Sequence, residues 1–413
     1  MLRKKKPIMQ SLLQVDWYKL TMGQYVFNRY PDIPVKYAFK NRTVKVELAN
    51  LISEDDLREE LDAFRGLRFK DDELRYLDNV RVAGKNLFSK KYLEFLKNLR
   101  LPEYFLEKSG GQYAIEFPGY WSKAIYWETP ALAIINELAN RAFVEKNGGQ
   151  PQDLYKEGMA RLQRKIDKLR QYPEIKFSDF GTRRQYSDDW HRIVTANLMN
   201  QLPGQFTGTS NALFAKEYGL QPIGTMAHEL FMGMSGIMHG SDDEIYASHN
   251  KVLEGWYQEY GSALSIALTD TYGTDFFFKD MTAEQARAWR GLRHDSGDPI
   301  VFGEKAIAFY KRYGIDCKEK ILVFSDGLEV GTILKIFNHF FGRIGVSFGW
   351  GTNLTNDLGI NALSLVIKLI ESRGHGTVKL SDNLAKATGK PEDVERFKKI
   401  FGHTINNREE CIY

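Results

Sequence analysis

Two short glycine-containing segments in the last third of the chain carry the first chemical signal in this sequence. They are Phe324-Ser-Asp-Gly-Leu-Glu329 and Phe348-Gly-Trp-Gly-Thr-Asn353, and each follows an apolar run. A glycine there lets the backbone approach a phosphate, and the N–H groups that open the next helix favour an anion. One such loop is often only a tight turn, but two in succession favour a phosphate site. Its predicted members are Asp326, Gly327, Gly349, Gly351, Thr352 and Asn353.

A histidine and two aspartates follow other apolar runs. His228 ends the run Gly-Thr-Met-Ala-His, where a neutral imidazole can attack a phosphoryl group, act as an acid or base, or simply be hydrogen-bonded structure. Asp270 can orient one ring nitrogen and leave the other free. In Arg293-His-Asp-Ser-Gly-Asp298, Asp295 and Asp298 can bind sugar hydroxyls directly or Mg²⁺ through water, or can cap a turn.

The segment Asp179-Phe-Gly-Thr-Arg-Arg184 places an aromatic ring beside two guanidinium groups. Arginine side chains match carboxylates and phosphates, and the face of Phe180 suits a flat ring. The pattern fits a planar aromatic acid used together with a phosphorylated substrate. An ordinary surface loop with two solvated arginines is the alternative.

Several common motifs are missing from the sequence. There is no G-x-x-x-x-G-K-S/T loop, no third glycine of a dinucleotide fingerprint, no G-x-S-x-G elbow and no H-E-x-x-H pair. Any ATP site is therefore not a P-loop, and no resident metal cluster is predicted.

From about residue 174, short apolar runs end in polar residues or glycine and lead toward helical segments. Such alternation indicates parallel βα units and an α/β fold. Reactive residues at the strand ends are typical of an α/β barrel, although an open doubly wound sheet would place its site in the same way. The runs are 175–181, 222–229, 265–271, 291–297, 321–327 and 344–351.

The first third of the chain mixes strands and helices. Residues 34–43 read as a strand, and residues 112–130 read as a hairpin that turns at Pro118-Gly119. Residues 53–64 and 90–98 have helical spacing, and a longer helix is expected from Thr129-Pro130 to Asn147.

These elements predict two domains. An N-terminal α+β domain covers residues 1–130 and is joined by a returning segment near residues 375–413, with a possible strand at 377–382. A barrel-like α/β domain covers residues 131–374.

The composition is that of an ordinary globular protein, with 43% hydrophobic and 27% charged residues and a formal charge of +4. That charge is too close to balance to indicate nucleic-acid binding. No long apolar run predicts a membrane span, and the basic start at residues 1–7 is not followed by a signal-peptide core. Cys317 and Cys411 are expected to be unpaired thiols, which suits the cytoplasm.

Taken together, eight segments in order resemble the bacterial-type nicotinate phosphoribosyltransferase family. They cover nearly the whole chain, so the resemblance is far more specific than any single motif. The segments are Ser11–Met22, Phe177–Arg184, Phe206–Asn211, Gly224–Glu229, Ile266–Thr271, Gly291–Pro299, Leu322–Leu328 and Ser347–Thr355.

The resemblance implies a type II phosphoribosyltransferase, with an α+β domain packed on an irregular, incomplete α/β barrel. Such proteins are usually homodimers with active sites at the subunit interface. It also implies that nicotinate and phosphoribosyl pyrophosphate give nicotinate mononucleotide and pyrophosphate, with Mg²⁺ and coupled ATP hydrolysis, in NAD biosynthesis. No nucleic-acid or membrane partner is expected.

The same resemblance implies roles for individual residues. His228 would be phosphorylated by ATP with support from Asp270, and Phe180 would stack on the pyridine ring. Tyr18 would reach in from the other subunit and cover the opposite face of that ring. The remaining substrate-binding residues and the third catalytic residue would be Arg183, Arg184, Ser210, Arg293 and Asp295.

Three alternatives are weighed against this function. A quinolinate-using relative would be shorter and should carry more basic residues for a second carboxylate. A nicotinamide phosphoribosyltransferase would carry an acidic residue matching Ser210, which suits an amide N–H. A barrel that only binds a phosphorylated metabolite would leave the histidine and aspartates without a role. The sequence departs from the family at Gln185, where an arginine is common, and at Gly327, where asparagine is frequent. The first departure leaves open which arginine binds the nicotinate carboxylate.

Overall fold

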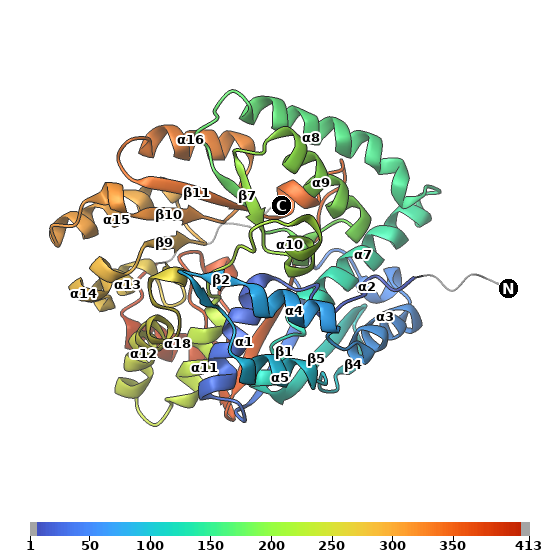
Figure 1. The fold of residues 1–413 in the computed structure, drawn as a ribbon. Coiled ribbons are helices and arrows are strands. Elements are labelled where there is room, and N and C mark those ends of the chain that lie inside the picture. The colour runs from blue at the N-terminus through green and yellow to red at the C-terminus, as the bar shows by residue number, and fades with distance from the viewer. Residues whose placement is uncertain (1–5, 406–413) are drawn as a thin grey trace.

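The computed structural model describes residues 6–405, in which two main β-sheets lie side by side with helices around them (Figure 1). One sheet has five strands and its strands pair antiparallel. Their order across the sheet is β13 (His375–Gly376), β12 (Leu365–Ser372), β1 (Pro34–Asn41), β5 (Gln112–Tyr120) and β4 (Phe105–Ser109).

The second sheet has six parallel strands, and its two edge strands do not pair with each other. It is therefore an open, incomplete barrel, which confirms the predicted α/β fold class. Its order is β7 (Phe206–Thr209), β6 (Phe177–Asp179), β11 (Gly345–Trp350), β10 (Ile321–Phe324), β9 (Gly291–His294) and β8 (Ile266–Leu268).

Helices of the first half of the chain mostly surround the antiparallel sheet, apart from α8 and α9, which pack beside the parallel one (Figure 1). A small hairpin of β2 (Arg81–Val82) and β3 (Lys85–Asn86) lies among them. The helices are α1 (Trp17–Arg29), α2 (Leu48–Leu51), α3 (Glu54–Gly66), α4 (Asp71–Asn79), α5 (Lys90–Lys97), α6 (Trp121–Ala124), α7 (Glu128–Lys146), α8 (Tyr155–Leu169) and α9 (Asp188–Gln201).

In the second half, short helices connect the parallel strands, and α12 and α18 pack against each other. The helices are α10 (Ala212–Tyr218), α11 (His228–Ile237), α12 (Asp242–Tyr260), α13 (Thr274–Asp280), α14 (Ala283–Ala288), α15 (Pro299–Arg312), α16 (Val330–Phe340), α17 (Thr352–Thr355) and α18 (Pro391–Phe401).

Most of the predicted elements are confirmed. The strand at 34–43, the helices at 53–64 and 90–98 and the helix ending at Asn147 are present, as are strands within five of the six apolar runs. No helix within residues 6–405 combines the length and the apolar character needed to cross a membrane. Cys317 is an unpaired, buried thiol, and Cys411 lies outside the described residues.

The hairpin predicted over residues 112–130 is wrong. The chain does not turn at Pro118 and Gly119, because both residues continue β5 and pair with Lys36 and Val35 of β1. After Tyr120 the chain forms α6 and then α7. All residues of 121–130 except Lys123 are buried, and a helix satisfies its own backbone N–H and C=O groups in such a place, where a returning strand would need a partner strand.

The strand predicted at 222–229 is also wrong. Only Pro222 makes a β-bridge, to Thr209, and the following residues cross the carboxyl ends of the parallel strands without pairing. The side chain of Arg293 on β9 donates a hydrogen bond to the carbonyl oxygen of Met226. In a strand, the backbone N–H of a neighbouring strand would be the partner of such an oxygen. His228 is consequently the first residue of α11 and does not end a strand.

The possible strand at 377–382 is reduced to a single bridge between Lys379 and Thr388. The strand that returns to the antiparallel sheet is instead β12, which pairs with β1 along its whole length. This strand lies inside the range predicted for the barrel domain. The exact domain limits, including the part beyond residue 405, stay predictions.

The packing of α15 on α16 gives a first test of this fold. A Cβ added at Gly303 would lie 2.1 Å from the ring of Phe340, so Gly303→Ala should lower the free energy of unfolding by about 1–3 kcal/mol. Gly331→Ala in α16 is the matched control, because nothing lies within 4 Å of its Cβ position. That control should be neutral or stabilising by up to about 1 kcal/mol in urea unfolding. Equal effects of both substitutions would contradict the packing described here.

Candidate active site

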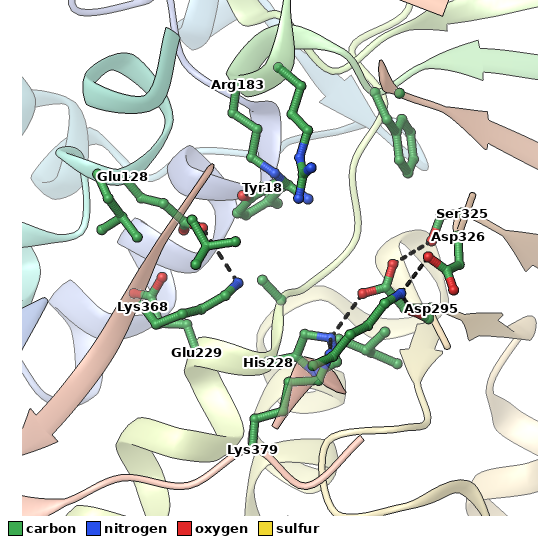
Figure 2. Close-up of a pocket in the computed structure, with 18 of the residues that line it drawn as sticks. Tyr18, Glu128, Arg183, His228, Glu229, Asp295, Ser325, Asp326, Lys368 and Lys379 are labelled. Carbon is green, nitrogen blue, oxygen red and sulfur yellow. Dashed lines mark hydrogen bonds and ion pairs between the residues drawn. The ribbon is translucent and has the colours of Figure 1, made fainter. Parts of the chain in front are cut away.

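A cavity opens at the carboxyl ends of the parallel strands, where the antiparallel sheet and α11 meet them (Figure 2). It gathers residues from distant parts of the chain, including most of the residues predicted from the sequence. The predicted residues that line it are Tyr18, Phe180, Arg183, Arg184, His228, Arg293, Asp295, Asp326, Gly327, Gly351, Thr352 and Asn353.

His228 is held by groups on both sides of its ring. Nδ1 lies 2.9 Å from Thr271 Oγ1, and Nε2 lies 2.8 Å from Lys379 Nζ and 3.0 Å from Asp295 Oδ2. Because an ammonium group only donates, Nε2 of a neutral ring accepts from Lys379 and Nδ1–H donates to Thr271. Nε2 is thus the nitrogen that carries the lone pair, which accepts from Lys379, and it lies beside the carboxylate of Asp295.

The charges around His228 control its protonation. Burial lowers the pKa of His228 to about 4, and the neighbouring Lys379 acts in the same direction. Burial by itself would raise the pKa of Asp270, but Lys379 and His228 outweigh it and lower that pKa to about 2. At neutral pH the arrangement is therefore a neutral imidazole beside an ammonium and carboxylates.

Asp270 does not line the cavity but lies behind His228. Its carboxylate accepts from Ser296 Oγ at 2.6 Å and lies 3.3 Å from Lys379 Nζ and 3.6 Å from His228 Nε2. Asp270 therefore acts on the cavity through Lys379 and His228.

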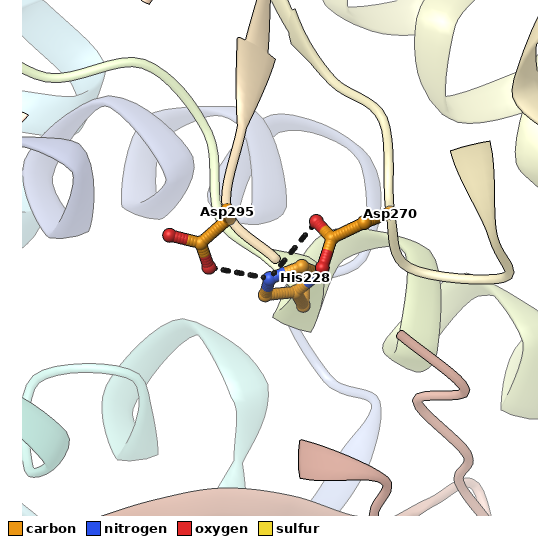
Figure 3. A group of neighbouring side chains, drawn as sticks. All are labelled: His228, Asp270 and Asp295. Atoms are coloured by element: carbon orange, nitrogen blue, oxygen red, sulfur yellow. Dashed lines mark hydrogen bonds and ion pairs between the residues drawn. The ribbon is translucent and has the colours of Figure 1, made fainter. Parts of the chain in front are cut away.

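His228, Asp270 and Asp295 also have the arrangement of a metal site, since one ligand atom from each lies within 4.8 Å of the others (Figure 3). In this structure the positive charge at that place is the ammonium of Lys379. A buried lysine paired with two of the three groups suits an anion that approaches the imidazole better than it suits a second cation.

The carboxylate of Asp295 is fixed by two side-chain donors, Arg293 and Ser325. Arg293 Nη2 lies 3.2 Å and Ser325 Oγ 2.9 Å from Asp295 Oδ1, and Arg293 Nε donates to Ser325. Burial opposes ionisation, but Arg293 and Lys379 hold the pKa of Asp295 well below its usual value. This carboxylate is therefore ionised and oriented.

The two glycine loops lie on this side of the cavity. Gly327 has a φ of +54°, which a residue with a side chain rarely adopts, and α17 begins at Thr352 directly after Gly351. Lys386 Nζ donates to Asp326 and, at 3.0 Å, to the carbonyl oxygen of Asp295. This end of the cavity thus combines backbone N–H groups, a lysine and two carboxylates.

Gly349 has a different use from the one expected. It does not line the cavity, and a Cβ there would lie 2.4 Å from the ring of Phe180. The phenyl ring of Phe180 is thus the group that lies close to the backbone of Gly349. The Arg293 guanidinium lies 5.5 Å from the centre of the same ring. Gly349 therefore fixes the position of Phe180.

The loop that carries Phe180 is anchored by a buried acid–histidine pair that the sequence analysis missed. Asp179 Oδ2 lies 2.6 Å from both His191 Nε2 and Thr209 Oγ1, and Asp179 Oδ1 accepts from the N–H of Gly181 at 2.7 Å. The other ring nitrogen of His191 lies 2.8 Å from Gln185 Oε1. The two ends of the loop, at Asp179 and Gln185, are thus tied to one imidazole.

Tyr18 lies in the cavity of its own chain. The expectation that it reaches into the site of another subunit stays a prediction. Arg183 Nη1 donates to Tyr18 Oη at 2.9 Å and lies 3.6 Å from Asp16 Oδ2. The reason is local, because Trp17 N–H donates to Ser210 O and Asp16 bridges to Asn211 in the same chain.

Ser210 lies outside the cavity wall. Its hydroxyl donates to Asp16 Oδ1 at 2.6 Å, so it reaches Arg183 through Asp16. Burial raises the pKa of Asp16, while Arg183 lowers it. Ser210 therefore orients Arg183 through Asp16, and this role does not require Ser210 to contact a ligand in the cavity.

Several cavity residues were not found from the sequence. Glu128, Lys368, Lys379 and Lys386 lie in segments that read as ordinary helix or strand, and Ser325 was seen only as part of a loop. No local pattern marked any of them, although Lys379 lies in the possible strand at 377–382. Each is recognisable only by its neighbours in space.

An open parallel α/β barrel, capped by an antiparallel domain and carrying a basic cavity with a phosphate-type loop, defines a phosphoribosyltransferase-like enzyme. Two family models match the chain. The nicotinate phosphoribosyltransferase family matches residues 175–405, and the N-terminal domain of that family matches residues 13–136.

Solved structures give the same result. The chain is similar to nicotinate phosphoribosyltransferase from Porphyromonas gingivalis, with 32% identity, a TM-score of 0.84 and coverage of 96% of this chain and 100% of that one. It is also similar to nicotinate phosphoribosyltransferase from Vibrio cholerae, with 32% identity, a TM-score of 0.85 and coverage of 97% and 96%. This chain belongs to the nicotinate phosphoribosyltransferase family.

The electrostatics around His228 can be checked by NMR. We expect the ring of His228, assigned by its loss in His228→Asn, to stay neutral until the pH falls to about 4. Lys379→Met should raise this pKa, because it removes a cation that disfavours the imidazolium. Titration at the ordinary histidine value in the wild type would contradict the burial described above.

The same shift has a consequence for stability. The unfolded chain binds a proton at His228 near pH 6.5, whereas the folded chain binds it only near pH 4, so the unfolding free energy falls as the pH drops through this window. His228→Asn should make that fall shallower in urea titrations at pH 7, 5.5 and 4.5.

Proposed function

We propose that this protein transfers the phosphoribosyl group of phosphoribosyl pyrophosphate to nicotinate, giving nicotinate mononucleotide and pyrophosphate. One observation carries the proposal. A single cavity holds an aromatic and arginine end, at Tyr18, Phe180 and Arg183, and a phosphate-type end, at Asp326 and Thr352. His228 and Asp295 lie between these ends (Figure 2).

In this proposal the pyridine ring lies between Phe180 and Tyr18, and its nitrogen attacks C1′ of the ribose. The N–C bond forms as the bond from C1′ to the pyrophosphate oxygen breaks, through a cationic, oxocarbenium-like state. Fixing the ring and the ribose in one cavity lowers the barrier by supplying orientation in advance. The ionised Asp295, held by Arg293, can bind ribose hydroxyls and stabilise the developing positive charge.

The 5′-phosphate fits the loops at Gly327 and Gly351–Asn353, whose backbone N–H groups and Thr352 hydroxyl are donors. Mg²⁺ prefers oxygen ligands, and Asp295 and Asp326 are the carboxylates in the cavity that fit it beside the pyrophosphate. When bound there, Mg²⁺ would neutralise charge that develops on the leaving group. Lys379 and Lys386 add fixed positive charge at the same end.

We further propose that ATP phosphorylates His228. Nε2 would attack the γ-phosphorus, forming the N–P bond as the bond to the β-phosphate oxygen breaks and ADP leaves. The neutral ring, with Nδ1–H directed at Thr271, supports this role because it leaves the Nε2 lone pair for the attack. Lys379 would then move from Nε2 to the phosphoryl oxygens. Hydrolysis of the phosphohistidine could drive the cycle through states of different substrate affinity.

The function is tested by one assay with the purified protein, phosphoribosyl pyrophosphate, Mg²⁺ and ATP. We expect ATP-stimulated mononucleotide from nicotinate, with little from nicotinamide or quinolinate, because the Arg183 guanidinium lies beside Tyr18 at the ring site. The measurement is product formation by chromatography over time. Comparable kcat/KM for nicotinamide would reject the assignment, and absence of any product would favour a barrel that only binds a metabolite.

The phosphohistidine is tested by His228→Ala. We expect this variant to lose ATPase activity completely while slow, ATP-independent ribosyl transfer survives, because the residues that hold ribose and pyridine are unchanged. His239→Ala is the control, since His239 lies outside the cavity and should leave both activities intact. Equal loss of transfer and ATPase activity in His228→Ala would argue against the phosphohistidine.

Nicotinamide phosphoribosyl transfer is the second candidate, and one observation favours it. The buried Asp16 has an oxygen, Oδ2, with no hydrogen-bond partner among residues 6–405, and a carboxylate there could accept an amide N–H. Against it, Arg183 lies closer to the cavity and compensates this charge.

A homodimer and a cytoplasmic location remain part of the proposal, the latter supported by the unpaired Cys317.

A further inference from the structure

Lys368 projects from β12 into the cavity, and its charge is poorly compensated. Its nearest carboxylate oxygen is Glu128 Oε1, at 3.9 Å. The other oxygen of Glu128 is already bound by Lys19 Nζ at 2.7 Å, and Lys19 also bridges to Glu229. Lys19 is thus the main partner of Glu128, and Lys368, whose side chain is partly buried, is left with a long contact.

Other cations of the cavity have close partners. Lys379 lies 2.8 Å from His228 Nε2, and Lys386 donates to Asp326. Arg293 donates to Ser325 at 2.8 Å, and Arg183 donates to Tyr18 at 2.9 Å. Compared with these four, Lys368 is the cation that has the most to gain from an incoming anion.

The position of Lys368 indicates which anion this is. Figure 2 shows Lys368 with Glu128 on the side of Tyr18 and Arg183, whereas Ser325, Asp326 and Asp295 lie across the cavity beyond His228. The side of Tyr18 and Arg183 is where the proposed function places the pyridine ring. The phosphate loops and their lysine, Lys386, lie on the other side.

We propose that Lys368 binds the carboxylate of the pyridine substrate, together with Arg183, and so distinguishes the acid from its amide. This inference rests on the proposed function. Arg183 alone would bind a carboxylate weakly, because Asp16 lies 3.6 Å from it and offsets part of its positive charge. Lys368 supplies the positive charge that an acid needs and an amide does not.

The surroundings of Lys368 add a pH dependence to this role. Burial lowers the pKa of Lys368 to about 7, with Glu128 on α7 raising it and Arg183, Lys379 and Arg42 lowering it. A carboxylate that arrives beside the amine favours the ammonium form and raises the pKa. Binding of the acid above pH 7 is therefore coupled to proton uptake, and its affinity should decline as the pH rises further.

The test compares Lys368→Met with Lys368→Arg, which keeps the charge, and with Lys40→Met. Lys40 is exposed on the adjacent strand β1 and lies outside the cavity, so its substitution controls for charge loss on the same sheet. Thermal unfolding of each variant shows whether it is folded. KM is measured for nicotinate and for phosphoribosyl pyrophosphate, and kcat/KM for nicotinamide, from pH 6 to 9.

In Lys368→Met, KM for nicotinate should rise about 10–100-fold, the loss expected for one charge-assisted hydrogen bond. KM for phosphoribosyl pyrophosphate should stay within about twofold, and the preference for nicotinate over nicotinamide should shrink. The decline of kcat/KM for nicotinate above pH 7 should flatten in this variant and move to higher pH in Lys368→Arg.

Three outcomes would overturn the inference. They are an unchanged KM for nicotinate in a folded Lys368→Met, a rise in KM for phosphoribosyl pyrophosphate alone, and an equal effect in Lys40→Met. Each leaves the proposed function standing, because the wild type still turns over nicotinate. A wild type without nicotinate turnover would instead remove the proposed function, and this inference with it.

Discussion

His228, Asp270, Asp295 and Lys379 lie buried against one another although they come from four separate segments of the chain. Burying any one charge of this group alone would be unfavourable, because the free-energy cost of removing it from water exceeds its attraction to a distant opposite charge. The carboxylates can ionise only with the ammonium present, and the ammonium is tolerable only with them. The start of α11, the carboxyl ends of β8 and β9 and the segment after β13 must therefore meet at one point, which fixes how the C-terminal part of the chain crosses the barrel.

A second buried group ties the antiparallel sheet to the same place. Glu229, next to His228, accepts from Lys19 on α1, from Tyr37 on β1 and from Trp121 on α6. Three elements of the N-terminal domain are thus bonded to one carboxylate at the start of α11. The cavity lies between these two buried groups, so its walls come from both sheets and neither domain forms the site by itself.

Rigid anchoring also explains the aromatic end of the cavity. Phe180 lies on a loop whose two ends are bound to His191, and the ring rests against Gly349, where a side chain would not fit. The glycines of two segments that look alike in the sequence therefore have different structural roles. Gly327 adopts a backbone conformation that opens the phosphate-type loop, whereas Gly349 makes room for a neighbouring ring.

Local patterns in the sequence determined the element types wherever one face of a segment is buried. They predicted five of the six parallel strands, the first strand of the antiparallel sheet in chain order, and twelve of the residues that line the cavity, including His228, Asp295 and Phe180. They failed where a contact from elsewhere decides the conformation, as for residues 112–130 and 222–229.

Only the tertiary structure decided which charges meet. His228 and Lys379 are separated by 151 positions, and nothing in the run around Lys379 or Lys368 distinguishes either lysine from one on the surface. A side chain's protonation and its ability to bind an anion depend on burial and on neighbours within a few ångströms. Those quantities exist only once the chain is folded, because distant segments set them together.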